Sequence, residues 1–407
     1  MIFAHLADVH LGGWRYPELQ ELNLKAFKKA IEICIEKKVN FVVISGDLFE
    51  NAVPPVDVLK EAVSEFRRLK EANIPCYIVP GSHDYSVTGK TFIEVLEKAG
   101  LCKNVALVEE KKEKTILNFF YDKKNKVLLA GIPGKKVNLE IEFFKNLEIK
   151  ISDKFKDFFK IFVFHTTLTE MKPIEEMPSI SISSLPAGFD YYAGGHLHLI
   201  DIRKKENALV AYPGPLFPNN IEELEKLRGG NFFIVEYKNK EFKIEKQEIF
   251  LKDVISLEVD VSGLPIEEAN LKIIREISKL DLKDKIFILR IVGCLSSGKT
   301  SEIDFENIKE KSKNAYLLLK NTSKLSTKDL ELEIEAENKT IEELEKEIIE
   351  LYNKQIPEEF KSYSRFILPL LENINFEKSE EEKKQDFEKR VIDSICKILN
   401  INFENDN

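Results

Sequence analysis

Residues 76–84 read CYIVPGSHD, in which four apolar residues and a Pro-Gly pair precede Ser82, His83 and Asp84. The apolar run predicts a buried strand, and the polar residues follow its carboxyl end. In open α/β sheets, ligands bind just beyond the carboxyl ends of the strands. This stretch therefore predicts a functional site, whose nature depends on the residues that follow the neighbouring strands.

The first third of the chain alternates between strand and helix patterns. IFAHLA at residues 2–7 and FVVIS at 41–45 predict strands, and helix-spaced apolar residues predict helices over 24–35 and 56–69. With the run at 76–79, these segments form two βαβ units. Because βαβ crossovers are right-handed, we expect the strands to be parallel and their carboxyl ends to meet at one edge of an α/β sheet.

Together with the segments that follow, the first third of the chain predicts three domains. KIFVF at 160–164 and DYYAGG at 190–195 repeat the strand pattern, and residues 231–250 predict a hairpin that turns at 238–240 and closes a first domain over residues 1–250. Short strands and helices then predict a small α+β domain over 251–325.

The tail, residues 326–407, carries amphipathic helix patterns. Capping-box signatures begin at Thr340 and Ser379. The second precedes apolar residues at every fourth position, which are Phe387, Val391, Ile395 and Leu399. Such a stripe packs either on the protein's own core or on a partner, and the pattern alone leaves both open.

The composition is that of a globular protein in water. The chain has 407 residues, 43% of them hydrophobic, and a net charge of −9. No apolar run approaches the roughly 18 residues of a membrane span, and the first residues lack the basic start of a signal peptide. The five cysteines are scattered without CxxC spacing, which predicts reduced thiols in the cytoplasm and argues against structural zinc.

Titratable residues gather where the predicted strands end. Five of the six histidines lie there beside carboxylates, in a set made of Asp8, His10, Asp47, Ser82, His83, Asp84, His165, His196 and His198. A lone histidine is usually structural, but five at strand ends indicate a site. Mixed imidazole and carboxylate ligands suit Mn, Fe or Zn better than Mg or Ca. The set contains more ligands than one ion needs, so it predicts two ions bridged by a carboxylate. Enzymes use such a pair of ions for in-line attack on phosphorus.

The ordered motifs DxH, GD, GSHD, H and GHxH resemble those of the calcineurin-like metallophosphoesterases over about residues 1–215. Within them, ADVHLG, GDLFE followed by two prolines, and the spacing to GSHD resemble the SbcD-type nuclease subunit of the double-strand-break repair complex, most closely its archaeal members. The Arg after GD and the Glu after the third motif that mark the protein phosphatases are absent. The resemblance implies a two-sheet sandwich flanked by helices, with a small α+β capping domain and a helical tail.

The resemblance also implies roles for individual residues. Asp8, His10 and His198 would hold one metal, His165 and His196 would hold the other, and Asp47 would bridge them. His83 would assist the departing alcohol oxygen by protonating it or stabilising its charge.

The roles of two further residues of the GSHD stretch, Ser82 and Asp84, are more open. Asp84 would orient His83, or alternatively would cap a turn. Ser82 stands where the family has an Asn whose amide oxygen binds the second metal. Because a hydroxyl is a shorter and weaker ligand, we hypothesise that the second metal is held less tightly here.

The function implied is that of a manganese-dependent DNA exonuclease or endonuclease in double-strand-break repair, with two Mn²⁺ ions favoured over Mg²⁺. The expected partners are single- and double-stranded DNA ends, a second copy of the chain, and an SMC-like SbcC-type ATPase that binds the C-terminal helices; no membrane is involved. Two alternatives are a phosphoesterase acting on small phosphodiesters and a catalytically weak subunit that binds DNA ends.

One further motif, GCLSSGKT at 293–300, matches the phosphate-binding P-loop pattern and follows a predicted strand. No later strand ends in the acidic residue that would help to hold magnesium, and the surrounding domain is small for a nucleotide-binding sheet. We therefore favour a Gly-rich turn, in which Lys299 is a candidate phosphate contact.

Overall fold

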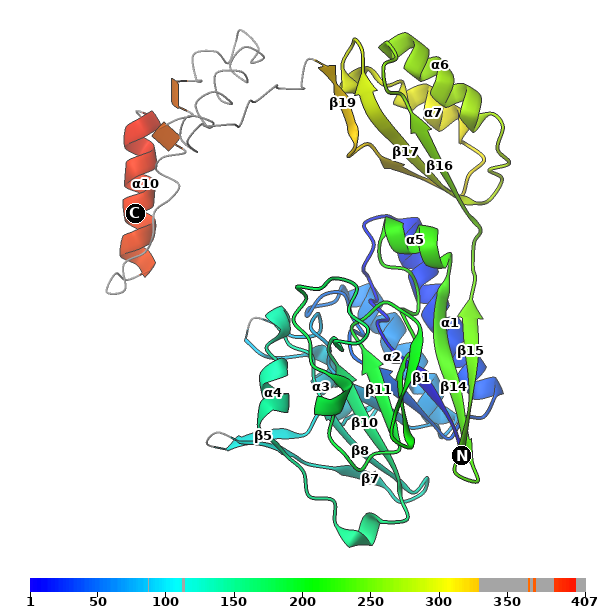
Figure 1. Ribbon diagram of the computed structural model, residues 1–407, viewed down its shortest axis with the longest axis vertical. Helices are drawn as coiled ribbons and strands as arrows, with labels where there is room; N and C mark the ends of the chain where they lie inside the picture. Colours follow the sequence, from blue (N-terminus) through cyan, green and yellow to red (C-terminus); the bar gives the residue numbers. More distant parts are fainter. Residues whose placement is uncertain (87, 112–113, 329–364, 367–368, 371–383, 400–407) are drawn as a thin grey trace. The chain divides into compact units, whose positions relative to one another are not determined.

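The computed structural model describes residues 1–86, 88–111, 114–328, 365–366, 369–370 and 384–399 (Figure 1). By compactness it divides into one unit of residues 1–260, 270–292 and 304–324 and another of 261–269, 293–303 and 325–407. The predicted domain borders at 250 and 325 stay predictions. The α-helices are α1 (Pro17–Glu36), α2 (Val56–Glu71), α3 (Phe92–Lys98), α4 (Ile141–Lys145), α5 (Ile221–Leu227), α6 (Ile266–Ile277), α7 (Phe305–Lys311) and α10 (Lys384–Leu399).

The first sheet has six strands in the order β15-β14-β1-β2-β3-β4. Their bounds are β1 (Ile2–Leu6), β2 (Phe41–Ser45), β3 (Cys76–Val79), β4 (Lys103–Asn104), β14 (Gly230–Lys238) and β15 (Glu241–Ile249). β1 to β4 are parallel, which for β1, β2 and β3 confirms the two predicted βαβ units. β14 and β15 form the predicted hairpin, and its turn residues Asn239 and Lys240 both have positive φ, as a tight two-residue hairpin turn requires.

The second sheet also has six strands, in the order β12-β13-β11-β10-β8-β7. Their bounds are β7 (Phe120–Asp122), β8 (Val127–Ile132), β10 (Phe159–His165), β11 (Tyr191–Gly195), β12 (Asp201–Lys205) and β13 (Ala208–Tyr212). The four central strands are parallel. Their carboxyl ends therefore share one edge, as in the first sheet.

Alternation along the strands builds a sandwich of layers. Phe3 and Val43 point into a core shared with Val163 of the second sheet, whereas Ala4 and Val42 join the core under α1 and α2. A third core backs the second sheet and includes two phenylalanines of α4. The buried side chains of α1 recur every three or four residues behind a proline at its first turn, which is why this segment is helical. The predicted two-sheet sandwich flanked by helices is confirmed.

Two smaller sheets complete the described strands. One comprises β5 (Val108–Lys111), β6 (Lys114–Leu117) and β9 (Leu147–Glu148), and the other β16 (Val254–Asp260), β17 (Ile286–Leu295), β18 (Leu317–Asn321) and β19 (Leu325–Thr327). With α6 and α7, the latter sheet has the α+β composition that the sequence predicts.

The P-loop-like stretch is a turn in the structure. The element directly after β17 is a three-residue 3-10 helix, Thr300–Glu302, and α7 begins only at Phe305, beyond the motif, so its N-terminus is not the one a P-loop would turn toward a phosphate. Gly298 has φ +88°, and a Cβ at this position would lie 2.6 Å from Ile266 Cγ2. The turn and its packing therefore account for this glycine, and the contact of Lys299 with phosphate stays a prediction.

The helical tail is described only in part. The capping box at Thr340 and the one at Ser379 both begin outside the described residues, whereas the apolar repeat from Phe387 to Leu399 lies on α10. Phe387, Val391 and Ile395 are half-buried, and charged residues between them are exposed. Among the described helices, none combines the length and hydropathy that a bilayer span requires.

Candidate metal centre

The strand ends of both sheets meet at one place. Asp8 follows β1, Asp47 follows β2, His165 ends β10 and His196 follows β11. β10 lies against β2 and β3 across the sandwich. The carboxyl ends of the two sheets therefore present their polar residues to each other, because the strands of each sheet run parallel.

Six of the predicted residues form two groups of three. In the first ligand group, the nearest ligand atoms of Asp8, His10 and His198 lie within 4.8 Å of one another. The second ligand group, Asp47, His165 and His196, meets the same limit. Each group contains one carboxylate and two imidazoles, which suits a first-row divalent ion.

Asp47 lies between the two groups. Its Oδ2 atom is 3.1 Å from Nε2 of His165 and 3.7 Å from Nε2 of His10. Its other oxygen accepts a 2.8 Å hydrogen bond from the backbone N–H of His83. One carboxylate oxygen therefore faces imidazoles of both groups while the other is held by the chain.

Four of the six residues have a strained backbone with positive φ. Asp8, His10 and Asp47 have φ between 47° and 49°, and His196 has φ 91°. Non-glycine residues adopt such angles rarely and at a cost of about 1–3 kcal/mol each. This concentration among the six residues indicates a site whose side-chain directions are imposed by the fold.

Glycines leave room for the second ligand group. A Cβ on Gly46 would lie 2.1 Å from Nδ1 of His165, and one on Gly195 would lie 1.9 Å from the carbonyl oxygen of Ser45. A Cβ on Gly81 would lie 2.2 Å from Oδ1 of Asp47. The glycines of the GD, GSHD and GGH motifs are therefore required by close packing at the second ligand group and at the end of β2.

The site also contains buried polar atoms without hydrogen bonds among the described residues. These are Oδ2 of Asp8 and Nε2 of His165, the latter 3.1 Å from Asp47 but without hydrogen-bond geometry. Nδ1 of His165 donates to the carbonyl oxygen of Ser45 at 2.9 Å, so Nε2 is the nitrogen left for a ligand. Buried polar atoms are rarely unpaired in proteins, and a bound cation would satisfy both. The residues present thus fit metal ions.

The charges at the site shift its pKa values. Burial disfavours the imidazolium of His10, but surrounding carboxylates, led by Glu50, outweigh it and raise its pKa to about 9. Burial also disfavours the imidazolium of His165, but the neighbouring carboxylates, led by Asp47, outweigh burial and raise its pKa to about 10. Burial and the neighbouring His165 lower the pKa of His196 to about 3. Without metal, His10 and His165 therefore carry protons where cations would bind.

The sixth histidine, His5, is structural. It is buried, and burial lowers its pKa to about 3. Ser45 donates its hydroxyl proton to Ala193, so it accepts from Nε2 of His5, whose Nδ1 accepts from Tyr191. This network holds the end of β2 directly behind His165, which bonds the same serine's carbonyl oxygen.

His83 and Asp84 lie at this edge in different environments. The ring of His83 is 42% exposed, and its Nδ1 donates to the carbonyl oxygen of Glu50 at 2.9 Å. Asp84 is buried and accepts backbone hydrogen bonds from Gly81, Leu48 and Phe49. The expectation that Asp84 orients His83 is therefore wrong, and the alternative of a turn cap fits, because three N–H donors occupy its oxygens. Ser82 lies half-buried between Gly81 and His83.

Two glutamates that the sequence did not single out contact the first ligand group, and an asparagine links them. Glu50 accepts from Nδ1 of His10 at 2.8 Å, and Glu223 accepts from Nδ1 of His198 at 2.9 Å. Asn219 bonds both glutamates. Glu50 ends the GDLFE stretch and lies three residues after Asp47, but nothing local marks Asn219.

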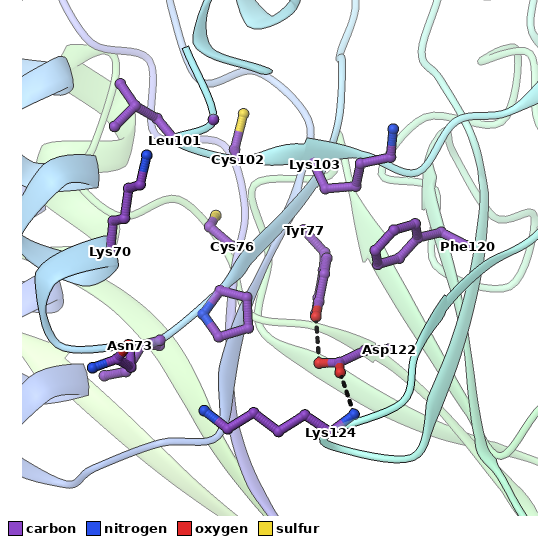
Figure 2. A pocket seen from close by; sticks show the side chains of 13 residues that line it. Lys70, Asn73, Cys76, Tyr77, Leu101, Cys102, Lys103, Phe120, Asp122 and Lys124 are labelled. Atoms are coloured by element: carbon purple, nitrogen blue, oxygen red, sulfur yellow. Dashed lines mark hydrogen bonds between the residues drawn. The ribbon is translucent and has the colours of Figure 1, made fainter. Parts of the chain in front are cut away.

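A prominent pocket lies elsewhere. About 430 Å³ in volume, it opens beside the first residues of β3, at the end opposite His83, and Cys76, Cys102 and Lys70 are among the residues that line it. Figure 2 shows Tyr77 in it, donating a hydrogen bond to Asp122. None of the predicted site residues lines this pocket, so its size does not identify the functional site.

Comparison with known proteins identifies the domain that contains the site. Residues 1–199 match the family model described as calcineurin-like phosphoesterase. The chain is 28% identical over 391 residues to the DNA double-strand break repair protein Mre11 of Archaeoglobus fulgidus, covering 88% of this chain and 82% of that protein. It is 27% identical to that of Methanocaldococcus jannaschii, covering 79% and 80%. It is 31% identical to that of Methanococcus maripaludis, covering 58% of this chain and 62% of that protein, which is less than two thirds.

The matched region contains β1 to β11 and His198, and thus every residue of both ligand groups. Residues 1–199 therefore form a calcineurin-like phosphoesterase domain, and the chain is similar over most of its length to archaeal Mre11 proteins.

Proposed function

We propose that the protein is a metal-dependent DNA nuclease that hydrolyses phosphodiester bonds at a two-metal site, and that it acts in double-strand-break repair. The observation that carries the proposal is the position of Asp47, one oxygen of which faces imidazoles of both ligand groups. The names of the relatives, DNA double-strand break repair proteins, support DNA as the substrate class.

The ligand groups define which residues would hold the ions. Asp8, His10 and His198 would bind one, His165 and His196 the other, and Asp47 both. Two bound ions would neutralise a phosphodiester and activate the attacking water. The imidazole-rich donor set favours Mn²⁺ over Mg²⁺, which prefers oxygen ligands.

His83 is suited to act on the leaving group. Its Nδ1–H is held by the carbonyl oxygen of Glu50, so Nε2 of the exposed ring is available to substrate. A proton on Nε2 would pass to the departing alcohol oxygen, or a hydrogen bond from it would stabilise the charge there. The exposure of the ring lets an extended strand reach it.

The partners belong to the same proposal. We infer that the chain acts as a homodimer in the cytoplasm, binds single- and double-stranded DNA ends, and docks an SbcC-type ATPase through residues 326–407. The apolar stripe of α10, flanked by exposed charges, supports a docking helix.

The test is cleavage of end-labelled single- and double-stranded DNA with Mn²⁺ by the wild type and by His83→Gln. General acid catalysis contributes about 10²–10⁴-fold, so we expect a loss of that size on DNA. A nitrophenyl phosphodiester provides the matched control substrate. Its leaving group departs without a proton, and the variant should hydrolyse it nearly as well as the wild type.

The same assay separates the alternatives. Wild-type cleavage of the nitrophenyl ester without cleavage of DNA would replace the proposal with a phosphoesterase for small phosphodiesters. DNA binding without any cleavage would favour a catalytically weak subunit that binds DNA ends. The hypothesis that Ser82 is a weaker ligand than the Asn of the family is what favours this last candidate.

A further inference from the structure

A belt of three polar side chains surrounds the imidazoles of the first ligand group. Glu50 Oε2 accepts from His10 Nδ1 at 2.8 Å and from the Asn219 side-chain amide at 3.1 Å. Glu223 Oε1 accepts from His198 Nδ1 at 2.9 Å, and its Oε2 accepts from the Asn219 backbone N–H at 2.8 Å. The chain of contacts thus runs from His10 through Glu50, Asn219 and Glu223 to His198.

The belt determines which nitrogen each imidazole offers. A carboxylate only accepts hydrogen bonds, so Nδ1 of His10 and of His198 must carry a proton. Their Nε2 atoms then turn toward each other and lie 3.1 Å apart.

The surrounding chain holds the belt rigidly. The indole N–H of Trp14 donates to the carbonyl oxygen of Pro218 at 2.8 Å, which fixes the loop before Asn219. A Cβ on Gly13 would lie 2.3 Å from Oδ1 of Asn219, so the glycine makes room for the amide. Glu223 lies in the first turn of α5, where Asn220 caps the helix and donates to Glu223 Oε1 at 2.6 Å.

The second ligand group has no such belt among the described residues. His165 donates to a neutral backbone carbonyl, that of Ser45, and the ring of His196 has no hydrogen bond there. Ionised acceptors form hydrogen bonds roughly twice as strong as neutral ones and make the imidazole a better metal ligand. The two groups therefore differ in the strength of the hydrogen bonds that orient their imidazoles toward an ion.

We propose that Glu50, Asn219 and Glu223 are positioning residues that orient His10 and His198 before metal arrives, so that the first ligand group binds its ion more tightly than the second. This inference rests on the proposed two-metal site and adds an order of loading. The first ligand group fills at low metal concentration, and the second fills only at higher concentration.

The experiment is calorimetric titration of Mn²⁺ into the metal-free full chain, with thermal unfolding of the metal-free proteins measured in parallel. Residues that orient metal ligands typically contribute 10–100-fold to affinity, so Glu50→Gln and Glu223→Gln should each weaken the tighter step by about that factor. Glu222→Gln, an exposed neighbour on α5, is the matched control and should leave both steps unchanged.

Two variants, each of which disables one ligand group, show which binding step belongs to which group. With His165→Ala, which disables the second ligand group, the remaining step should stay tight and should weaken when Glu223→Gln is added. With His198→Ala, the remaining step should be weak and should not respond to Glu223→Gln.

The outcomes separate the two proposals. Absence of Mn²⁺ binding by the wild type would overturn the two-metal site itself. Two wild-type steps that the glutamate variants leave unchanged, or a loss in the weaker step instead, would overturn the positioning role alone. A lower unfolding temperature without a change in affinity would show that the belt serves only the fold.

Discussion

The two ligand groups meet at Asp47, but different parts of the chain orient their imidazoles. The imidazoles of the first, His10 and His198, are oriented by side-chain carboxylates. His165 of the second is oriented by a backbone carbonyl and enclosed by glycines. Side chains control the first group, whereas the path of the chain controls the second.

The difference determines how each group responds to mutation. A carboxylate can be removed from the first group while the fold remains, because Glu50 and Glu223 are partly exposed. The second group cannot be altered behind His165 without moving the strand ends themselves. Metal affinity and fold stability are therefore separable in the first group and coupled in the second.

The largest expected effect tests this coupling. Gly46→Ala would place a Cβ 2.1 Å from Nδ1 of His165 at φ +85°, so we expect a loss of more than about 3 kcal/mol of folding free energy, together with loss of the second metal. Gly263→Ala is the control, because its φ is +73° and nothing lies within 4 Å of the added Cβ. It should lose only about 1–2 kcal/mol, the cost of the left-handed backbone. Urea unfolding measures both, and equal losses would contradict enclosure of the second group by glycine.

The next largest expected effect is the release of protons when metal binds. The pKa of His10 is raised to about 9 and that of His165 to about 10, both above the ordinary 6.5, so each imidazole is protonated at pH 7.5 in the metal-free protein. Metal must displace these protons, so full loading should release about two of them, and affinity should rise with pH up to the two pKa values. Calorimetry in two buffers of different ionisation enthalpy counts the protons. Release of none at pH 7.5 would show that both imidazoles are neutral before metal binds.

The smallest expected effect sharpens the contrast at Ser82. If its hydroxyl leaves the second ligand group short of a ligand, Ser82→Asn should tighten the weaker Mn²⁺ step by about tenfold, or 1.4 kcal/mol, and raise DNA cleavage at limiting metal. Ser82→Ala is the control and should change little. No gain from Asn would refute the hypothesis that Ser weakens this group, and a large loss from Ala would show that the hydroxyl itself is a ligand.

Much of the site was predictable from local patterns. Period-two and helical spacings predict the strands and helices around residues 2–79, and parallel strands bring Asp8, Asp47 and His83 to one edge. The family resemblance implies the two ligand groups, and the structure brings the residues of each group together. The positions at the strand ends were predictable because each depends on a strand and on the few residues directly after it, whereas metal binding by these residues stays a prediction.

The contacts that differ from expectation are those made between loops. The sequence alone placed Asp8, His10, Asp47, His165, His196 and His198 at strand ends, where the chemistry of imidazole and carboxylate indicates metals. Only the tertiary structure decided that Asp84 caps a turn. It alone decided that Glu50 meets Asn219 across 169 residues of sequence. The physical reason is that periodicity is local, whereas a hydrogen bond between loops depends on where the whole fold brings their ends.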